Sequence, residues 1–225
     1  MISVVVPVYR SASTLEELHR RLAAALSGEE IELIFVDDAC PEGSAGVLRR
    51  LGAADPRVRI LTMEGNAGQH RALLRGLASA RGEAAVILDA DLQDPPEAVP
   101  LLLAALRRGP AAVFAGRRGA YESAARLFTS RVFKAVLSAA AGLPRDAGLF
   151  VALRRPLIDR LVACRSARPY LPAIIGLSGM AVESLPVERA RRPRGESSYR
   201  GLARLRTGLS ALAFAIGERW RRRKG

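Results

Sequence analysis

Two aspartates that follow an apolar run place carboxylates where a metal ion can be held. Asp89 and Asp91 stand directly after residues 85–88, which read Ala-Val-Ile-Leu. In an extended chain, side chains two positions apart point the same way, so both carboxylates can reach one divalent cation, and Gln93 continues that side. Mg²⁺ and Mn²⁺ sites use one or two carboxylates together with substrate phosphates. The spacing therefore predicts a Mg²⁺ or Mn²⁺ site within residues 89–96.

Other polar residues follow apolar runs in the same manner. Residues 37–38 (Asp-Asp) and 66–68 (Asn-Ala-Gly) each come after such a run. The carboxyl ends of parallel strands meet at one edge of a sheet, where ligands bind, so we expect these residues to share a rim with Asp89. For the Asp-Asp pair, a turn-forming role is as well supported as a binding role. Asp94 is expected to cap a helix that begins at Pro95 rather than to act in catalysis.

Short apolar runs that alternate with helical patterns predict βαβ units, and therefore an α/β domain with a mostly parallel, Rossmann-like sheet flanked by helices. The expected strands are residues 2–6, 31–36, 58–62, 84–88, 112–115, 148–153 and, near the end, 180–187. Helices are expected after Ser13, after Pro41, after Gly68 and from Pro95. Ser13 followed by Glu16 matches a capping box, and leucines recur at helical spacing through residues 15–26.

The second half of the chain is strongly basic. Residues 1–116 hold 12 arginines and 15 acidic residues, whereas residues 117–225 hold 23 basic and 7 acidic residues. This asymmetry favours an anionic partner, such as a phosphate or an acidic membrane surface, with an ordinary solvated surface as the alternative. A basic helix is expected over residues 122–140. Nucleic acid is not an expected partner, because aromatic residues make up only 5% of the chain and form no stacking platform.

The last 25 residues are expected to form a separate unit. Apolar residues repeat at helical spacing over 202–216, and residues 219–224 combine a tryptophan with a basic run. This pattern predicts an amphipathic helix and basic tail over residues 201–225 at a membrane surface, with a helix packed on the core as the alternative. Its apolar stretch is shorter than the roughly 20 residues that cross a bilayer. Two cysteines are too few for a disulfide framework, and the amino terminus lacks a signal-peptide pattern. The sequence therefore predicts a cytoplasmic location, peripheral to the inner face of the membrane.

Four segments, taken in order, resemble the signatures of family 2 glycosyltransferases with the GT-A fold. They are residues 4–9 (Val-Val-Val-Pro-Val-Tyr), 35–38 (Phe-Val-Asp-Asp), 66–69 (Asn-Ala-Gly-Gln) with Ala72 and Gly76, and 89–96 (Asp-Ala-Asp-Leu-Gln-Asp-Pro-Pro). The resemblance implies a GT-A catalytic domain over residues 1–200. It implies that a nucleotide-sugar donor contacts Pro7, Tyr9, Asp38, Asn66, Gly68 and Asp89. It also implies that Asp89, Asp91 and Gln93 hold the metal on the donor diphosphate, with Asp91 as a catalytic residue.

Within this family, the second half resembles the polyprenyl-phosphate sugar transferases. The resemblance depends on residues 116–117, on Arg126 with Ser130, on residues 146–150 and on the arginine-rich residues 189–199. It implies that an acceptor phosphate is held by Arg117, Arg126, Ser130, Arg192 and Ser197. It also gives Arg117 and Asp146 catalytic roles. On a helix, residues four apart share a face, so Arg126 and Ser130 can hold one phosphate together.

The resemblance implies inverting transfer of a sugar from a nucleotide-diphosphate donor to a polyprenyl phosphate at the membrane surface. Because the acceptor phosphate is already an anion, no general base is required. Two alternatives stay open: transfer to a saccharide hydroxyl, which needs Asp146 as a base, and nucleotide-sugar binding without catalysis. Residues 10–13 depart from the family pattern, which leaves the donor base open. Ser198 stands where the family usually has lysine, which removes a cation expected near the phosphates. In the family that the chain resembles, many members carry transmembrane helices after the catalytic domain, which ends here near residue 200. A membrane-anchoring partner protein is therefore a candidate partner.

Overall fold

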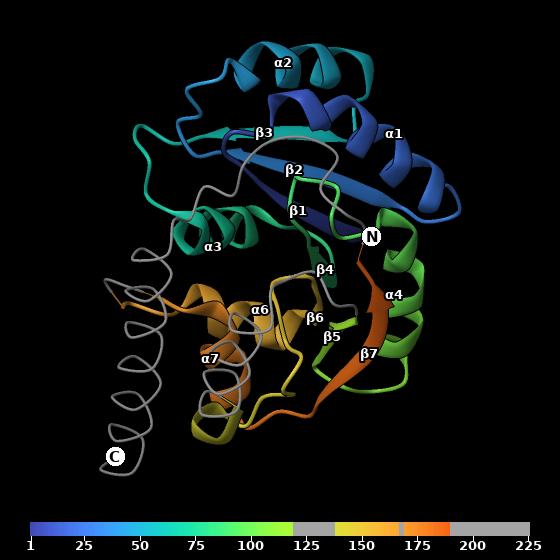
Figure 1. The fold of residues 1–225 in the computed structure, drawn as a ribbon, viewed down its shortest axis with the longest axis vertical. Coiled ribbons are helices and arrows are strands. Elements are labelled where there is room, and N and C mark those ends of the chain that lie inside the picture. Colours follow the sequence, from blue (N-terminus) through green and yellow to red (C-terminus); the bar gives the residue numbers. More distant parts are fainter. Residues whose placement is uncertain (119–137, 167–168, 190–225) are drawn as a thin grey trace.

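The computed structural model describes residues 1–118, 138–166 and 169–189 of the chain. Within these residues, seven strands form one sheet in the order β3-β2-β1-β4-β6-β5-β7 (Figure 1). The strands are β1 Ile2–Val8, β2 Ile31–Asp37, β3 Val58–Thr62, β4 Ala84–Ile87, β5 Ala112–Arg118, β6 Val151–Arg154 and β7 Val182–Glu188. β6 runs antiparallel to its neighbours β4 and β5, and the other pairs are parallel. The predicted mostly parallel α/β sheet is confirmed.

The central strands are mostly apolar because both of their faces are covered. Every residue of β2 is buried, including Glu32, and β1 is buried except at Pro7. Such uninterrupted burial is typical of parallel strands between two helical layers. The predicted strands lie at the expected places, and their ends differ by a few residues. β1 continues to Val8, which pairs with Asp37, because backbone pairing does not stop where the apolar run stops.

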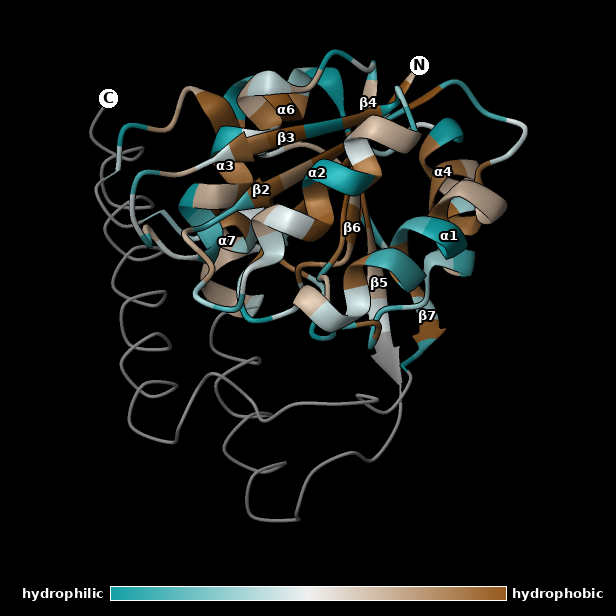
Figure 2. Ribbon diagram, turned by 90° about the horizontal axis from the view of Figure 1, so that it is seen from above, coloured by the Kyte–Doolittle hydropathy of each residue, from teal (hydrophilic) through white to brown (hydrophobic). Residues whose placement is uncertain are grey.

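Helices cover both faces of the sheet (Figure 1). They are α1 Leu15–Ala25, α2 Ser44–Ala54, α3 Gln69–Ser79, α4 Val99–Arg107, α6 Arg155–Val162 and α7 Leu171–Leu177, with the 3-10 turns η1 Ala12–Thr14 and η2 Pro96–Ala98. α1, α2 and α4 pack on one face, over a core that includes Leu18 and Phe35. α3, α6 and α7 pack on the other, over a core that includes Leu73 and Phe114. Figure 2 shows the apolar strands between these layers.

The start of α1 differs from the predicted capping box. η1 precedes the helix, Thr14 occupies the N-cap position, and its side chain makes no cap hydrogen bond. Thr14 Oγ1 instead lies 2.9 Å from the carbonyl oxygen of Ser11 and 2.5 Å from that of Ala90. The box predicted for Ser13 and Glu16 is therefore wrong, because a 3-10 turn replaces it. This turn ties the start of α1 to the loop after β4.

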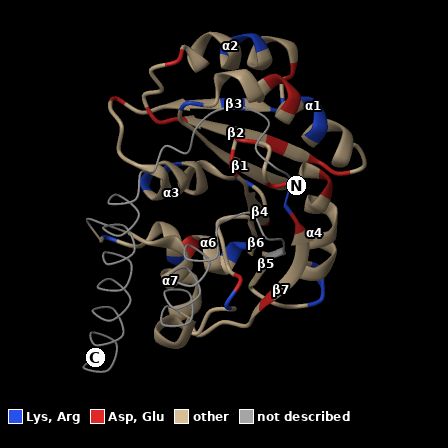
Figure 3. Cartoon of the chain, in the orientation of Figure 1, with Lys and Arg blue, Asp and Glu red and all other residues tan. Residues whose placement is uncertain are grey.

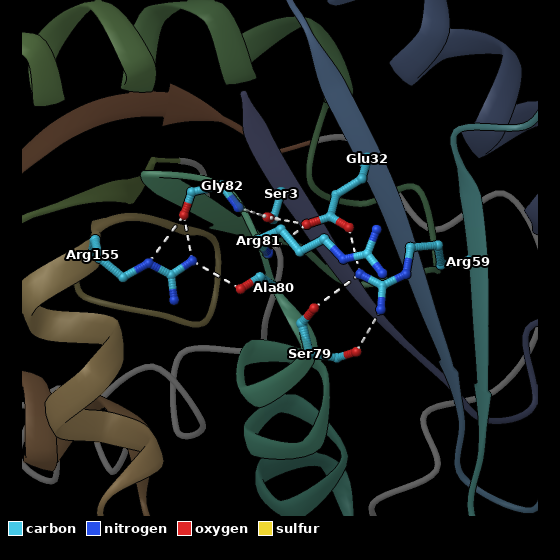
Figure 4. A network of polar contacts seen from close by, with 8 residues as sticks. All are labelled: Ser3, Glu32, Arg59, Ser79, Ala80, Arg81, Gly82 and Arg155. Atoms are coloured by element: carbon cyan, nitrogen blue, oxygen red, sulfur yellow. Dashed lines mark hydrogen bonds and ion pairs between the residues drawn. The ribbon is translucent and has the colours of Figure 1, made fainter.

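A buried polar network holds the connection between α3 and β4 at the amino end of the sheet (Figure 4). Glu32 Oε1 accepts hydrogen bonds from Ser3 Oγ at 2.6 Å and from the backbone N of Arg81 at 2.6 Å, and Oε2 pairs with Arg59 at 2.5 Å. Burial alone would raise the pKa of Glu32, but the hydrogen bonds from these three residues outweigh it and lower the pKa. The carboxylate is therefore a stable anion inside the fold.

The same connection is held from its other side by α6. Arg155 Nε donates to the carbonyl oxygen of Gly82 at 3.1 Å, and its terminal nitrogen donates to that of Ala80 at 2.9 Å (Figure 4). The backbone N of Gly82 donates to Ser3 Oγ at 2.9 Å. Because the Gly82 segment is bonded from both sides, β4 enters the sheet at a fixed position. Its opposite end leads into Asp89 at the carboxyl edge.

Two predicted segments lie mostly outside the described residues. Of the basic helix expected over residues 122–140, the structure describes residues 138–140, which are helical. Residues 201–225, predicted as the amphipathic unit, are not described. Among the described residues, none of the helices has the length and apolar character needed to cross a membrane.

Candidate functional site

Three loops at the carboxyl edge of the sheet contain backbone in the left-handed conformation. Arg10, Ala39 and Leu92 have φ angles of 54°, 52° and 59°, and among the described residues they are the non-glycine positions with positive φ. They follow β1, β2 and β4, which are neighbours in the sheet. This conformation is costly for a residue with a Cβ, and it is often retained at binding sites, where surrounding contacts hold it. We therefore take this rim as the candidate site.

Asp89 follows β4 closely, and Asp91 lies in the turn at residues 90–91. The strand ends before them and Leu92 is left-handed, so the extended geometry on which their prediction depended is wrong. Asp89 Oδ1 accepts a hydrogen bond from Gln69 Nε2 at 2.5 Å, and Asp91 Oδ1 accepts one from the backbone N of Gln93 at 3.1 Å. These bonds orient both carboxylates at the rim. Gln93 is held through its backbone, and metal ligation by its side chain stays a prediction.

The two carboxylates suit a divalent cation that a ligand helps to hold. Asp89 and Asp91 are both half-buried, so part of each side chain faces solvent. Carboxylate oxygens are hard donors, and each accepts more than one contact. Among the described residues, no group of three or more His, Cys, Asp or Glu side chains is arranged to hold a metal ion. Two carboxylates suit an ion whose other ligands come from a bound phosphate.

Asp94 pairs with the residue that follows β7. Its Oδ1 accepts a hydrogen bond from Arg189 Nε at 2.7 Å, with 3% and 16% of the two side chains exposed. The predicted helix cap is wrong, because η2 has Pro95 at its N-cap and no side-chain cap bond. Burial would lower the pKa of Arg189, but the hydrogen bond to Asp94 and the charges of Asp94, Asp89 and Asp91 raise it. One guanidinium thus lies in the field of three carboxylates.

Asp38 organises the loop that leads into α3. Its two carboxylate oxygens accept hydrogen bonds from the backbone N of Ala67 at 2.7 Å and of Gly68 at 3.0 Å. Asn66 Nδ2 donates to the carbonyl oxygen of Asp38 at 3.4 Å. Gly68 has a φ of 87°, which glycine adopts without strain. α3 then begins at Gln69, the residue that donates to Asp89, so Asp38 supports the position of Asp89 through this loop.

The turn after β1 lies against the turn after β2. The guanidinium carbon of Arg10 is 5.5 Å from the centre of the Tyr9 ring, and the backbone N of Arg10 donates to Cys40 Sγ at 3.1 Å. Burial raises the pKa of the Cys40 thiol, but hydrogen bonds from Ser44 and from backbone N–H groups lower it overall. No local pattern in the sequence marked Cys40 as a partner of this strained turn. The donor contacts predicted for Pro7 and Tyr9 stay predictions.

Asp146 packs directly on Gly116, near the end of β5. A Cβ on Gly116 would lie 2.1 Å from Asp146 Oδ2 and 2.5 Å from Ser184 Oγ, far inside any real contact distance. Glycine is therefore required for the carboxylate to sit here. Among the described residues, Ser184 Oγ is buried and has no hydrogen-bond partner. The structure brings Asp146 to the backbone just before Arg117, whose side chain is outside the described part.

The other residues predicted for the acceptor phosphate are not described. Arg126 and Ser130 fall within residues 119–137, and Arg192 and Ser197 fall within residues 190–225. Their roles therefore stay predictions. In the described part, acidic residues mark the loops that join β2 to α2 and β3 to α3 (Figure 3). This agrees with the acidic balance of the first half of the chain.

Comparison with known proteins gives a consistent result. Residues 3–153 match Glycosyl transferase family 2. Among curated relatives, the undecaprenyl-phosphate 4-deoxy-4-formamido-L-arabinose transferase of Pseudomonas fluorescens (strain Pf0-1) is 32% identical over 204 residues, covering 88% of this chain and 60% of the relative. The protein of the same name from Salmonella paratyphi A (strain ATCC 9150 / SARB42) is 32% identical over 203 residues, covering 88% and 62%. The chain thus spans about three fifths of the length of these relatives.

Solved structures share the fold. A mannosyltransferase from Pyrobaculum calidifontis, in complex with GDP-Man and Mn²⁺, has a TM-score of 0.69 at 23% identity, covering 96% of this chain and 64% of that one. Glucosyl-3-phosphoglycerate synthase from Mycobacterium tuberculosis, with Mn²⁺, UDP and glucosyl-3-phosphoglycerate, has a TM-score of 0.67 at 25% identity, covering 96% and 80%. The predicted GT-A fold is confirmed. Because the family match also spans more than half of the 225 residues, the chain belongs to glycosyltransferase family 2.

Proposed function

We propose that the chain is a Mg²⁺- or Mn²⁺-dependent glycosyltransferase that moves a sugar from a nucleotide-diphosphate donor to a polyprenyl phosphate, with inversion at the anomeric carbon. The observation that carries the proposal is the half-buried pair Asp89 and Asp91, oriented beside the loop that Asp38 organises. A cation on this pair and a nucleoside on the neighbouring loops can share one diphosphate. The names of the curated relatives support undecaprenyl phosphate or a similar lipid as the acceptor.

Different residues of the rim are proposed to bind different parts of the donor. Asp89 and Asp91, with Gln93 as a third proposed ligand, hold a cation that stabilises the charge of the leaving diphosphate. Gln69 keeps Asp89 in place through its 2.5 Å hydrogen bond. Pro7, Tyr9, Asp38, Asn66 and Gly68 are proposed to line the nucleoside side. The rim thus orients the anomeric carbon for attack.

The acceptor phosphate has to be positioned for attack, and it does not need a residue that removes a proton from it. Its phosphate oxygen attacks the anomeric carbon while the bond from that carbon to the diphosphate breaks, and an anionic oxygen has no proton to lose. The residues proposed to hold this phosphate are Arg117, Arg126, Ser130, Arg192 and Ser197, with Asp146 beside them. Residues 201–225 are proposed to lie on the cytoplasmic face of an anionic membrane, with or without a membrane-anchoring partner protein. Sedimentation with phosphatidylglycerol vesicles tests this placement.

The proposal is tested by removing one metal carboxylate. Asp91→Ala, checked for folding by circular dichroism, should reduce Mn²⁺-dependent transfer to undecaprenyl phosphate by about 10²-fold or more. Glu97→Ala is the matched control, since Glu97 follows six positions later and pairs with Arg21 on the surface. It should leave the rate unchanged. A folded Asp91→Ala protein with full metal-dependent transfer would contradict the proposal.

The donor is identified by its effect on stability. A ligand that binds the folded state raises the melting temperature by mass action. UDP-sugars and GDP-sugars, each tested with and without Mn²⁺, should separate into one base that stabilises the protein and one that does not. Binding of a donor without turnover on any acceptor would favour a nucleotide-sugar-binding protein instead.

A saccharide hydroxyl is the second candidate acceptor, and the position of Asp146 favours it. A carboxylate held against Gly116 at a strand end can serve as the base that a hydroxyl requires. Asp146→Asn should then abolish transfer to a saccharide, whereas it should only reduce transfer to a polyprenyl phosphate. Parallel assays with both acceptors distinguish the two candidates.

A further inference from the structure

The Asp94–Arg189 ion pair is more deeply buried than a surface pair, and it lies beside the proposed metal carboxylates. Its two side chains are 3% and 16% exposed, and the bond between Arg189 Nε and Asp94 Oδ1 is 2.7 Å long. Removing two charges from water is costly, and a buried pair often adds little net stability. Among the described residues, Asp94 Oδ2 is buried without a hydrogen-bond partner, so the pair is not optimised for stability alone.

Arg189 adds a fixed positive charge to an acidic loop. Asp89, Asp91 and Asp94 lie within six consecutive residues. The negative charges of all three raise the pKa of the Arg189 guanidinium. Because the pair is largely withdrawn from solvent, salt screens its field less than it screens surface charges. A divalent cation that approaches Asp89 and Asp91 is therefore repelled by Arg189, while a diphosphate that approaches the same place is attracted.

We propose that Arg189, held in place by Asp94, makes the metal site selective for a cation that arrives with a diphosphate. This inference rests on the proposed metal-dependent function and refines it. Arg189 weakens the hold of Asp89 and Asp91 on a free cation. The diphosphate supplies negative charge that compensates both the cation and the guanidinium, so all three bind together. Asp94 is thus a positioning residue, and Arg189 determines what the site accepts.

The inference is tested with two probes that need no sugar transfer. The first is Mn²⁺ alone, whose free concentration is followed by electron paramagnetic resonance, and the second is inorganic pyrophosphate without metal, followed by calorimetry. Arg189→Gln should tighten Mn²⁺ by about tenfold, because a nearby like charge is removed, and should weaken pyrophosphate by a similar factor. Arg189→Lys keeps the charge and should restore both affinities in part. A purely structural role for Arg189 does not produce two shifts of opposite sign.

A matched control comes from the other end of β7. Arg108 pairs with Glu183 at 3.3 Å, and Arg108→Gln removes the same unit of charge far from the rim. It should move neither affinity by more than about twofold, since distant surface charges are screened. If Arg189→Gln does not fold, the variant Asp94→Asn with Arg189→Gln replaces the ion pair by a neutral hydrogen-bonded pair. Its loss of pyrophosphate binding then serves as the readout.

Failure of the inference and failure of the proposed function give different results. Wild-type protein that binds no Mn²⁺ even in the presence of pyrophosphate contradicts the metal-dependent function itself. Wild-type protein that binds Mn²⁺ with pyrophosphate, together with unchanged affinities in the folded Arg189→Gln variant, overturns the role given to Arg189 and leaves the proposed function in place.

Discussion

Replacing Gly116 by alanine should displace Asp146 and lower the turnover number. The new Cβ would lie 2.1 Å from Asp146 Oδ2, whereas ordinary contact begins near 3.4 Å, so the carboxylate has to retreat by about 1 Å or more. If Asp146 has the catalytic role proposed for it, a displacement of this size costs on the order of 10²-fold in rate. We expect kcat to fall by about 10-fold to 100-fold while KM for the donor stays within about twofold, as measured by steady-state transfer assays.

Two further variants show whether the loss comes from the carboxylate. Gly46→Ala is the control, because no atom lies within 4 Å of the new Cβ and the residue is inside α2. It should keep full activity and gain about 0.5–1 kcal/mol of stability. Asp146→Asn should lose as much activity as Gly116→Ala, and combining them should add little, since both act on one side chain. A folded Gly116→Ala protein with wild-type kcat, beside an impaired Asp146→Asn protein, refutes the reasoning.

Three further predictions concern stability, each measured by urea unfolding. Gly76→Ala should cost about 1–3 kcal/mol, because its Cβ would lie 2.4 Å from Val5 Cγ1 in a closed core. Glu32→Gln should lower the free energy of unfolding by about 2–4 kcal/mol, because it leaves Arg59 without its anion. Folding lowers the pKa of Glu32, so the wild type should lose this stabilisation as the pH falls below the usual range of a glutamate. Burial lowers the pKa of His70 from 6.5 to about 4, so the unfolded chain binds a proton that the folded chain does not, and stability should fall by up to about 3 kcal/mol from pH 6.5 to pH 4. His70→Asn should remove that slope, and an unchanged slope contradicts the assignment.

The sheet and its rim could be predicted from the sequence because buried strands appear as apolar runs. A strand covered on both faces reads as an apolar run, as residues 33–36 do, and polar residues that end such runs lie at one edge when the strands are parallel. Strand ends are less predictable. β5 continues to Arg118 because it pairs with β7 as far as Glu188, and hydrogen bonding between backbones does not require apolar side chains.

The predictions that failed were those that assumed a nearby partner. Asp94 resembles a helix cap in sequence, but its carboxylate is taken by Arg189, 95 positions away. The capping box before α1 failed for a related reason, since Thr14 contacts Ala90, 76 positions away, and the chain forms a 3-10 turn. A short polar side chain bonds to whichever donor or acceptor the tertiary fold brings to it. Local patterns carry no information about that choice, and Gln69 was missed for the same reason.

The five aspartates at the rim differ in exposure, and exposure separates their roles better than their place in a motif does. Asp37, Asp38 and Asp94 are buried, and each is bonded to a group that shapes a loop: Asp37 to a backbone N–H of the turn after β2, Asp38 to two N–H groups before α3, and Asp94 to the arginine after β7. Buried carboxylates of this kind maintain structure, because a cation could reach them only by breaking the loop. Asp89 and Asp91 are half-buried, each oriented by a hydrogen bond to Oδ1. The sequence presents five similar acids. Folding buries three of them in the hydrogen bonds that build the rim and leaves Asp89 and Asp91 partly exposed, where the proposed cation would bind.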